Sequence, residues 1–350
     1  MLGALPPVFR ILVVGPAWVG DTVLAQPLFK RLHEKHPDLQ LDVLAPAWTV
    51  PLLARMPEVD TGILGPFGHG DLRLTQRWRL ARELRGRRYD QAIVLPNSFK
   101  SALVPAFAGI KLRTGFVGEL RQVLLNDARV LDKQALPLMT ERFAQLAEAP
   151  RAPLERPLPK LELRVVQADR DATLHKLGLD LDQPVACLCP GAEYGPAKRW
   201  PEAHFAALAT KLTGAGYQVW IIGSGKDRAI GAAIEQLSER HCRNLCGATD
   251  LGAAVDLLSV AALVVSNDSG LMHVAAALDR PMVALYGSSS PGFTPPLSAR
   301  AVVEKLDLPC SPCFQRECPL VHFNCMRQLD PQRVFDRALA IATRPAPACP

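Results

Sequence analysis

Short apolar runs alternate with helix-patterned segments along the chain. Residues 10–14, 39–44 and 91–95 are rich in Val, Ile and Leu, whereas apolar residues recur at helical spacing in 74–84. An uninterrupted apolar run is typical of a strand buried on both faces, as in a parallel sheet, and a spacing of three or four residues predicts a helix with one buried face. The alternation predicts an α/β fold with a doubly wound parallel sheet.

The same alternation restarts after a cluster of prolines, which marks the best candidate for an interdomain linker. These prolines are Pro150, Pro153, Pro157 and Pro159. The strands expected beyond them are residues 185–188, 217–222, 264–266 and 282–286. We expect an N-terminal domain over 1–165, a second α/β domain over 166–328, and a segment over 329–350. The helix expected in that last segment has an apolar side suited to packing back on the first domain.

Composition fits a globular protein with a weak preference for acidic partners. Of the 350 residues, 49% are apolar, and the net charge is +6. The start, residues 1–7, lacks the basic and apolar regions of a signal peptide, and no apolar run is long enough to span a membrane. We therefore expect a soluble, cytoplasmic protein.

Arginines crowd one segment of the first half. They are Arg73, Arg77, Arg79, Arg82, Arg85, Arg87 and Arg88. For most of them we favour a solvated helix face. The alternative for some is an anionic substrate or the inner leaflet surface, where each basic residue contributes about 1 kcal/mol.

Four of the nine cysteines gather near the C-terminus. They are Cys310, Cys313, Cys318 and Cys325. Their spacing lacks the paired C-x-x-C units of common zinc sites. We therefore favour reduced thiols in an irregular loop over a metal site.

One strand-to-helix turn is suited to an anion. The expected strand over residues 264–266 is followed by the turn Asp268-Ser269-Gly270. An apolar helix that contains His273 comes next. The amide groups at such a helix start attract phosphate. The turn by itself is more typical of an ordinary helix cap made by Asp268 or Ser269, and His273 by itself is more typical of a packed histidine.

A second loop, residues 15–21, follows the first strand. It lacks the G-x-G-x-x-G pattern, and no acidic residue follows the second strand to hold a ribose, which argues against a nicotinamide-dependent dehydrogenase. Asp21 at its end is either a helix cap or a base that takes a proton from a sugar hydroxyl.

Two further loops follow strands in the second half. Residues 190–201 contain Lys198, which is either an ordinary surface lysine or a cation for a departing diphosphate. Residues 221–227 contain Gly223, where the missing side chain allows a ligand to approach the backbone. Because strand ends meet at one sheet edge, these loops and the Asp268 turn predict a site for a nucleotide-sized ligand.

Four motifs, taken in order, resemble the bacterial heptosyltransferases of lipopolysaccharide inner-core synthesis. They are Gly20-Asp21, the loop 190–201, residues 267–273 and residues 310–318. The similarity spans nearly the whole chain. It is strongest to the members that add a heptose to the first heptose of the core. Gly20-Asp21 is unspecific alone, whereas the ordered set is specific.

The resemblance implies a GT-B fold, in which two Rossmann-like, doubly wound domains face a central cleft. It implies an ADP-heptose donor bound mainly by the second domain, a heptose-Kdo₂-lipid A acceptor bound mainly by the first, and inversion without a metal or other cofactor. It also implies a protein peripheral at the cytoplasmic face of the inner membrane, with no nucleic-acid partner.

The resemblance also assigns roles by position. Asp21 matches the catalytic base and Lys198 matches the phosphate-binding lysine. The residues that match the donor motif are Asp268, Ser269, Gly270 and His273. Glu193 and Tyr194 stand where other members have threonines near the phosphates and are weaker candidates. Ala17 and Trp18 replace the family's frequent hydroxyl residues, so no donor contact is assigned to them.

For the acceptor, basic residues near predicted strand ends are the candidates, each with an ordinary solvated charge as the alternative. They are Lys100, Arg113 and Arg121. Three other functions stay open at this point: heptosyltransferase I type transfer onto Kdo₂-lipid A, a nucleotide-sugar epimerase or hydrolase, and a non-catalytic anionic-glycolipid-binding protein.

Overall fold

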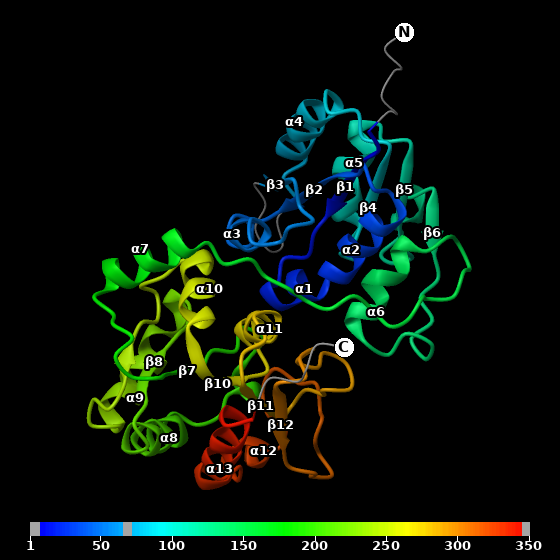
Figure 1. Cartoon of the computed structure of the whole chain (residues 1–350). Coiled ribbons are helices and arrows are strands. Elements are labelled where there is room, and N and C mark those ends of the chain that lie inside the picture. The colour runs from blue at the N-terminus through cyan, green and yellow to red at the C-terminus, as the bar shows by residue number, and fades with distance from the viewer. Residues whose placement is uncertain (1–7, 66–71, 345–350) are drawn as a thin grey trace. The chain divides into compact units, whose positions relative to one another are not determined.

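A computed structural model of the chain describes residues 8–65 and 72–344. The last residues of the expected 329–350 segment therefore lie outside the described part. The chain divides into two compact units, Met1–Lys160 and Leu161–Pro350. Each unit holds one parallel sheet with helices on its faces (Figure 1).

The first unit is built on a six-stranded parallel sheet of order β3-β2-β1-β4-β5-β6. Its strands are β1 Arg10–Val14, β2 Gln40–Ala45, β3 Thr61–Leu64, β4 Gln91–Val94, β5 Leu112–Phe116 and β6 Asp127–Arg129. Its described helices are α1 Val19–Leu24, α2 Gln26–Lys35, α3 Val50–Leu53, α4 Leu74–Arg85, α5 Leu103–Ala108 and α6 Met139–Ala144, with 3₁₀ turns η1 Phe99–Ala102, η2 Arg121–Val123 and η3 Gln145–Ala147. The central strand β1 pairs with β2 and β4, and its residues Ile11 to Val13 are fully buried, as its unbroken apolar run predicts.

The second unit repeats this plan with the order β12-β11-β10-β7-β8-β9. Its strands are β7 Val185–Cys189, β8 Gln218–Ile221, β9 Arg243–Asn244, β10 Ala261–Asn267, β11 Met282–Tyr286 and β12 Ala301–Lys305. Its described helices are α7 Gln167–Leu177, α8 Glu202–Gly214, α9 Arg228–Leu237, α10 Leu251–Ser259, α11 Gly270–Ala277, α12 Asn324–Arg327 and α13 Pro331–Ala342, with 3₁₀ turns η4 Pro196–Lys198 and η5 Gly225–Asp227. The predicted fold class of two doubly wound α/β units is confirmed.

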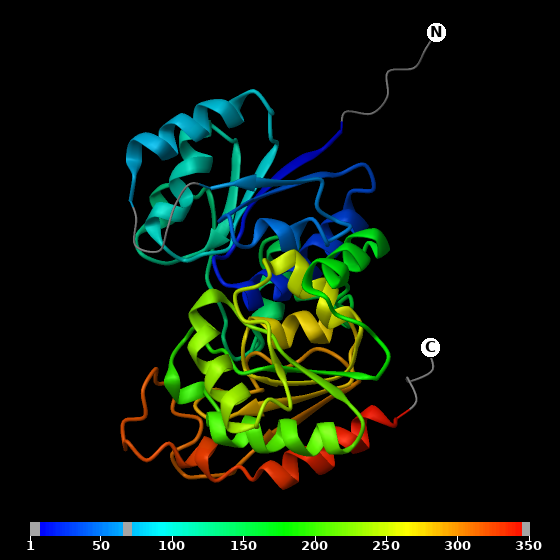
Figure 2. The same ribbon diagram turned by 90° about the vertical axis from the view of Figure 1, so that its left-hand side faces the viewer.

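The closing helix α13 packs within the second unit. Its buried residues Val334, Ala338 and Ile341 join the core that β10, β11 and α8 share. The red helix lies alongside the green α8 when the molecule is turned (Figure 2). The sequence suggested packing on the first domain, but this apolar side is already covered by the helix's own unit.

None of the helices in the described ranges combines the length and the apolar character that crossing a bilayer requires.

Candidate active site

Asp21 lies in the first turn of α1, directly after the loop that follows β1. Trp18, the residue before this helix, has an extended backbone, and its carbonyl accepts a hydrogen bond from the Thr22 hydroxyl at 2.9 Å. Because this loop follows the C-terminal end of β1 in a parallel sheet, it stands at the carboxyl edge, where open α/β sheets bind ligands.

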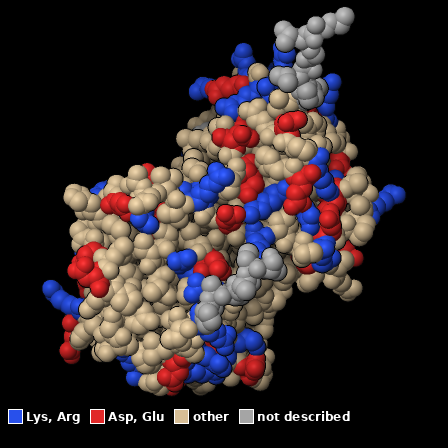
Figure 3. All heavy atoms as spheres, in the orientation of Figure 1, with Lys and Arg blue, Asp and Glu red and all other residues tan. Residues whose placement is uncertain are grey.

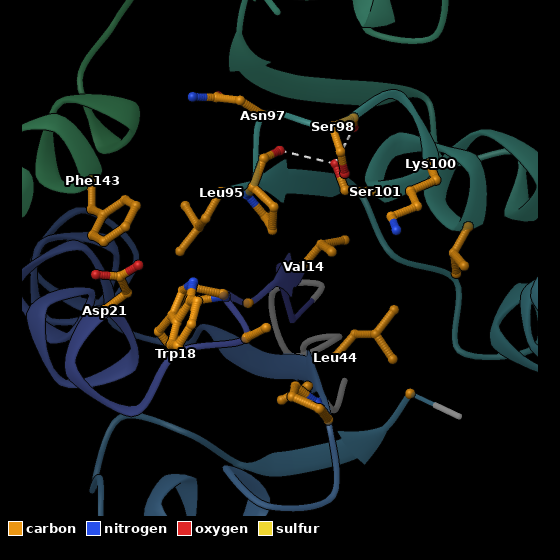
Figure 4. Close-up of a pocket in the computed structure, with 18 of the residues that line it drawn as sticks. Val14, Trp18, Asp21, Leu44, Leu95, Asn97, Ser98, Lys100, Ser101 and Phe143 are labelled. Atoms are coloured by element: carbon orange, nitrogen blue, oxygen red, sulfur yellow. Dashed lines mark hydrogen bonds between the residues drawn. The ribbon is translucent and has the colours of Figure 1, made fainter. Parts of the chain in front are cut away.

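A cavity of about 460 Å³ opens at this edge of the first unit. Its apolar walls include Val14, Leu44 and Leu95. Figure 4 shows the Asp21 carboxylate beside the Phe143 ring, with Lys100 on the opposite side. Asp21 is the single acid among the described residues that line this cavity. A carboxylate in such a wall is placed to accept a proton from a bound hydroxyl group.

Three cations also line the cavity: Arg77, Lys100 and Arg142. Arg77 donates through Nε to the carbonyl of Leu72 at 2.6 Å and through Nη1 to the carbonyl of Lys100 at 3.0 Å. Arg142 donates through Nε to the carbonyl of Leu136 at 2.9 Å, and burial lowers its pKa from the ordinary value. The cavity therefore suits a ligand that carries both hydroxyl groups and negative charge.

Sequence reasoning named Lys100 as an acceptor candidate, named Arg77 only among the crowded arginines of the first half, and missed Arg142. Arg77 shares the buried side of α4 with Ala81 and Leu84. An arginine on an otherwise apolar helical face was the sequence signal that could have indicated its buried position. For Arg142 no comparable pattern is present.

Arg113 and Arg121, the other predicted acceptor contacts, hold the backbone of their own unit. Arg121 is fully buried and donates through Nε to the carbonyl of Phe116 at 2.7 Å. Burial lowers its pKa to about 10. Arg113 donates through Nε to the carbonyl of Leu124 at 2.6 Å. Because these guanidinium groups are used internally, we do not carry them forward as acceptor contacts.

In the second unit, Lys198 and Asp268 form an ion pair. Lys198 ends η4 after β7, Asp268 follows β10, and Lys198 Nζ lies 2.5 Å from Asp268 Oδ2. Both side chains are largely buried, at 17% and 4% exposed. Neighbouring strands thus bring together two residues that are 70 positions apart in the sequence.

Asn267 fastens the two loops that carry this pair. Its Nδ2 donates to the carbonyl of Pro190 at 2.7 Å, and its Oδ1 accepts from the Trp200 amide at 3.1 Å. The Trp200 side chain is buried and donates to the carbonyl of Leu329 at 2.9 Å, as expected for a packing residue. The Lys198 loop is therefore held at both ends.

His273 lies buried in α11 near the ion pair. Burial lowers its pKa to about 4, while Asp268 raises it and Lys198 lowers it further. Its Nδ1 has no hydrogen-bond partner among the described residues. A buried histidine with this pKa is neutral at pH 7, so it contributes no charge to anion binding.

The start of α11 is not capped as either sequence alternative supposed. Ser269 precedes the helix in an extended conformation and makes no side-chain capping hydrogen bond. Its hydroxyl lies 3.3 Å from that of Ser266. Asp268 instead accepts from Lys198, and the helix itself begins at Gly270.

Glu193 and Tyr194 lie in the same loop as Lys198. Glu193 pairs with Lys226 of η5 on the surface. The Tyr194 ring lies 5.3 Å from Lys198 Nζ and 5.1 Å from the guanidinium of Arg316, and its hydroxyl donates to the carbonyl of Phe314 at 2.9 Å. Arg316 is a further cation at this edge that sequence reasoning did not name.

Gly223 has a structural reason to lack a side chain. A Cβ atom there would lie 2.9 Å from both the Asp227 Cβ and the Cys246 sulfur. The Ser224 amide and hydroxyl donate to the Asp227 carboxylate at 2.9 and 2.7 Å. The missing side chain therefore makes room for Asp227, where the sequence suggested room for a ligand.

Comparison with known proteins settles the family. The sequence model of glycosyltransferase family 9 (heptosyltransferase) matches residues 77–323, more than half of the chain. The chain belongs to this family.

Relatives in this glycosyltransferase family cover almost the whole chain. The lipopolysaccharide heptosyltransferase 2 of Escherichia coli K12 is 48% identical over 341 residues, which cover 95% of this chain and 98% of that protein. The protein of the same name from Salmonella typhimurium is 49% identical over 93% of this chain and 97% of its own length. The resemblance inferred from the four motifs is confirmed.

Solved structures agree with the fold. The structure of E. coli ADP-heptose LPS heptosyltransferase II superposes with a TM-score of 0.87 at 46% identity, covering 95% of this chain and 98% of that one. E. coli heptosyltransferase WaaC with ADP superposes with a TM-score of 0.71 at 21% identity, over 95% of this chain and 100% of that one, which supports the fold alone. The predicted GT-B class is therefore confirmed.

The cysteine cluster of this family 9 chain consists of free, half-exposed thiols: Cys310, Cys313, Cys318 and Cys325. Burial and the neighbouring thiols raise the pKa of Cys325. Among the described residues, no group of three or more His, Cys, Asp or Glu is arranged to hold a metal ion.

Proposed function

We propose that this chain transfers heptose from ADP-heptose to the first heptose of a heptose-Kdo₂-lipid A acceptor, with inversion at the sugar carbon. The substrates are inferred from the relatives named lipopolysaccharide heptosyltransferase 2, which share nearly half of its residues over almost its full length. The observation that carries the proposed chemistry is Asp21, the one acid among the described residues of the first unit's cavity.

The first unit supplies the base. Asp21 takes the proton of an acceptor hydroxyl as that oxygen attacks the anomeric carbon of the donor sugar. The bond between this carbon and the diphosphate oxygen breaks, and its electron pair leaves with ADP. Lys100 lines the same cavity and balances the negative charge of a lipopolysaccharide core, whereas the guanidinium groups of Arg77 and Arg142 donate to backbone carbonyls of their own unit.

The second unit supplies positive charge for the leaving diphosphate. Lys198 has three N–H donors, of which one meets Asp268 and the others are suited to phosphate oxygens. The amides at Ser269 and Gly270 stand at the positive end of α11. Asp268 positions Lys198 and is suited to sugar hydroxyls, since a direct contact with phosphate would set two anions together.

No metal or other cofactor enters this proposal, because Lys198 and the α11 amides provide the charge that a cation would otherwise provide.

Since the acceptor is embedded in a membrane, we further propose that the protein works as a peripheral protein at the cytoplasmic face of the inner membrane.

The test is a transfer assay with ADP-heptose and heptose-Kdo₂-lipid A, in which released ADP and the mass of the glycolipid are followed together. We expect equal amounts of ADP and of glycolipid enlarged by one heptose. In a parallel assay with Kdo₂-lipid A as the acceptor, transfer there but not onto heptose-Kdo₂-lipid A would assign the heptosyltransferase I reaction. ADP release without any change in the glycolipid would assign a hydrolase, and no ADP release at all would assign a binding protein.

A further inference from the structure

Helix α4 buries one side and exposes an unusual other side. Arg77, Ala81 and Leu84 face the interior of the first unit. On the outside, Trp78 is 50% exposed and Leu74 is 49% exposed. Exposing an indole ring and a leucine on one short helix leaves apolar area in water that burial elsewhere would stabilise, so a solvated helix face does not explain the pattern.

Positive charge surrounds these apolar side chains. We call the exposed residues of 72–88 the α4 surface; its arginines are Arg73, Arg79, Arg82, Arg85, Arg87 and Arg88. Glu83 is the single acid within 72–88. Figure 3 shows Lys and Arg spheres together with Asp and Glu spheres over this end of the first unit. Arg87 is paired with the buried carboxylate of Asp42. The other five arginines, set against one acid, make the surface complementary to a partner rich in negative charge.

Cationic and apolar groups are joined within this surface. The Arg82 guanidinium lies 4.8 Å from the centre of the Trp78 ring, one helical turn away. An indole ring is amphipathic and favours the boundary between headgroups and acyl chains, while arginine pairs with phosphate oxygens. Basic residues beside Trp and Leu on one helix are the combination found in helices that lie in a membrane surface.

We infer that the α4 surface docks this protein on an anionic phospholipid bilayer, with Trp78 and Leu74 entering the interfacial layer and Arg79 and Arg82 meeting lipid phosphates. The biological sense of this docking rests on the proposed function, because the proposed acceptor is anchored in lipid. The binding itself does not require any transfer activity.

The helix also connects this surface to the cavity of its own unit. Arg77, on the buried side of α4, donates to the carbonyl of Lys100, and both residues line the cavity that contains Asp21. Docking through the outer side of α4 therefore holds the cavity at a fixed distance from the headgroup layer.

The experiment is cosedimentation of the full chain with vesicles at low ionic strength. One set contains phosphatidylethanolamine and phosphatidylglycerol, and the other contains phosphatidylcholine alone. We expect the wild type to bind the anionic vesicles and not the neutral ones. The double variant Arg79→Glu/Arg82→Glu should bind at least about 30-fold more weakly, given the contribution of each basic residue near an anionic surface.

A matched control changes the same charge elsewhere. Arg164 and Lys176 are exposed residues of the second unit, so Arg164→Glu/Lys176→Glu alters the net charge equally. It should bind the vesicles within about threefold of the wild type, as screened long-range attraction allows. Equal losses in both double variants, or no wild-type binding to anionic vesicles, would overturn the docking site.

Trp78→Ala should weaken vesicle binding severalfold without changing the dependence of that binding on salt. Unchanged binding by this variant would also count against docking.

A soluble acceptor separates this inference from the proposed function. With a deacylated heptose-Kdo acceptor and no vesicles, the Arg79→Glu/Arg82→Glu variant should keep the wild-type rate. A loss of rate there would place the α4 surface in acceptor recognition and overturn the bilayer assignment. If neither the wild type nor the variant transfers heptose, but vesicle binding follows the expected pattern, the proposed function is wrong and the docking surface is still supported.

Discussion

At the scale of single residues, the sharpest expectation concerns Asp21. Asp21→Asn keeps the size of the side chain but removes the base, so kcat should fall by about 10² to 10⁴-fold while ADP affinity and thermal stability stay unchanged. Transfer kinetics, ADP titration calorimetry and thermal melts measure these three quantities. Asp38→Asn, a change at an exposed carboxylate away from the cavity, is the control and should leave kcat unaltered. Normal turnover by Asp21→Asn would refute the base assignment.

A second prediction concerns the ion pair of Lys198 and Asp268, where the effects of substitution on transfer activity and on folding stability can be told apart. Lys198→Met should weaken donor binding and slow transfer, and it should also lower the free energy of unfolding by about 1–3 kcal/mol, because it leaves a buried carboxylate without its partner. Adding Asp268→Asn removes that stranded charge. Urea unfolding should therefore show recovered stability in the double variant, while kinetics should show no recovered activity. A double variant that regains transfer would contradict the phosphate role of Lys198.

His273 predicts a pH dependence whose sign follows from its burial. Its pKa is lowered to about 4 in the folded chain, below the ordinary value of 6.5, so the unfolded chain binds the proton more tightly. The contribution to stability is complete above pH 6.5 and declines as the pH falls toward 4, by about 3 kcal/mol at most. The unfolding free energy of His273→Gln should lack this decline when the two proteins are compared from pH 4.5 to 8. Parallel curves would show that His273 does not titrate in this range.

Single residues also show which parts of the candidate site could be predicted from the sequence. Asp21 and Lys198 became candidates because each lies in a loop that follows a predicted strand, and the family resemblance then gave each its expected role. The pairing of Lys198 with Asp268 was not identifiable, since it depends on β7 and β10 being neighbours in the sheet. Arg121 was a candidate acceptor contact with a solvated charge as the alternative, and neither interpretation foresaw a guanidinium buried on backbone carbonyls, which its position in the sequence does not reveal.

At the scale of elements, the strands that sequence patterning missed share one property. They are β3, β6, β9 and β12, which are the edge strands of the two sheets. An edge strand is paired on one side and often short, so it lacks the unbroken apolar run by which a central strand is recognised. The segment after β1 forms two short helices, α1 and α2, and Pro27 lies in the first turn of α2, where a proline is tolerated.

The loop that carries Lys198 gives an element-scale prediction. A Cβ atom at Gly195 would lie 2.4 Å from the backbone oxygen of Arg316, a contact that a flexible side chain cannot relieve. Gly195→Ala should therefore lower the free energy of unfolding by about 1–3 kcal/mol and weaken ADP binding, because the Lys198 loop must move. Gly225→Ala is the matched control, since nothing lies within 4 Å of its added atom. Chemical denaturation and calorimetry should separate the two variants, and equal stability would contradict the tight loop contact.

At the scale of the whole molecule, the chain consists of two units with separate cores. One core cluster draws only on the second unit, from Ala186 to Ile341, and another draws only on the first, from Leu12 to Leu125. The repeated strand and helix pattern made two such units predictable. The partner of α13 was not predictable, because an apolar helix face indicates that it is buried without indicating against what.

The separate cores predict that residues 161–350 fold without the rest of the chain. All residues proposed to hold the donor lie in this part, including Lys198, Asp268 and Gly270, and its core includes the closing helix α13. The fragment should therefore melt cooperatively and bind ADP within about tenfold of the full chain, yet transfer no heptose, because Asp21 is absent. Lys198→Met in the fragment is the control and should abolish most of this binding. A fragment that folds but binds ADP much more weakly would mean that donor binding needs residues of the first unit, and the assignment of the donor site to the second unit alone would then be wrong.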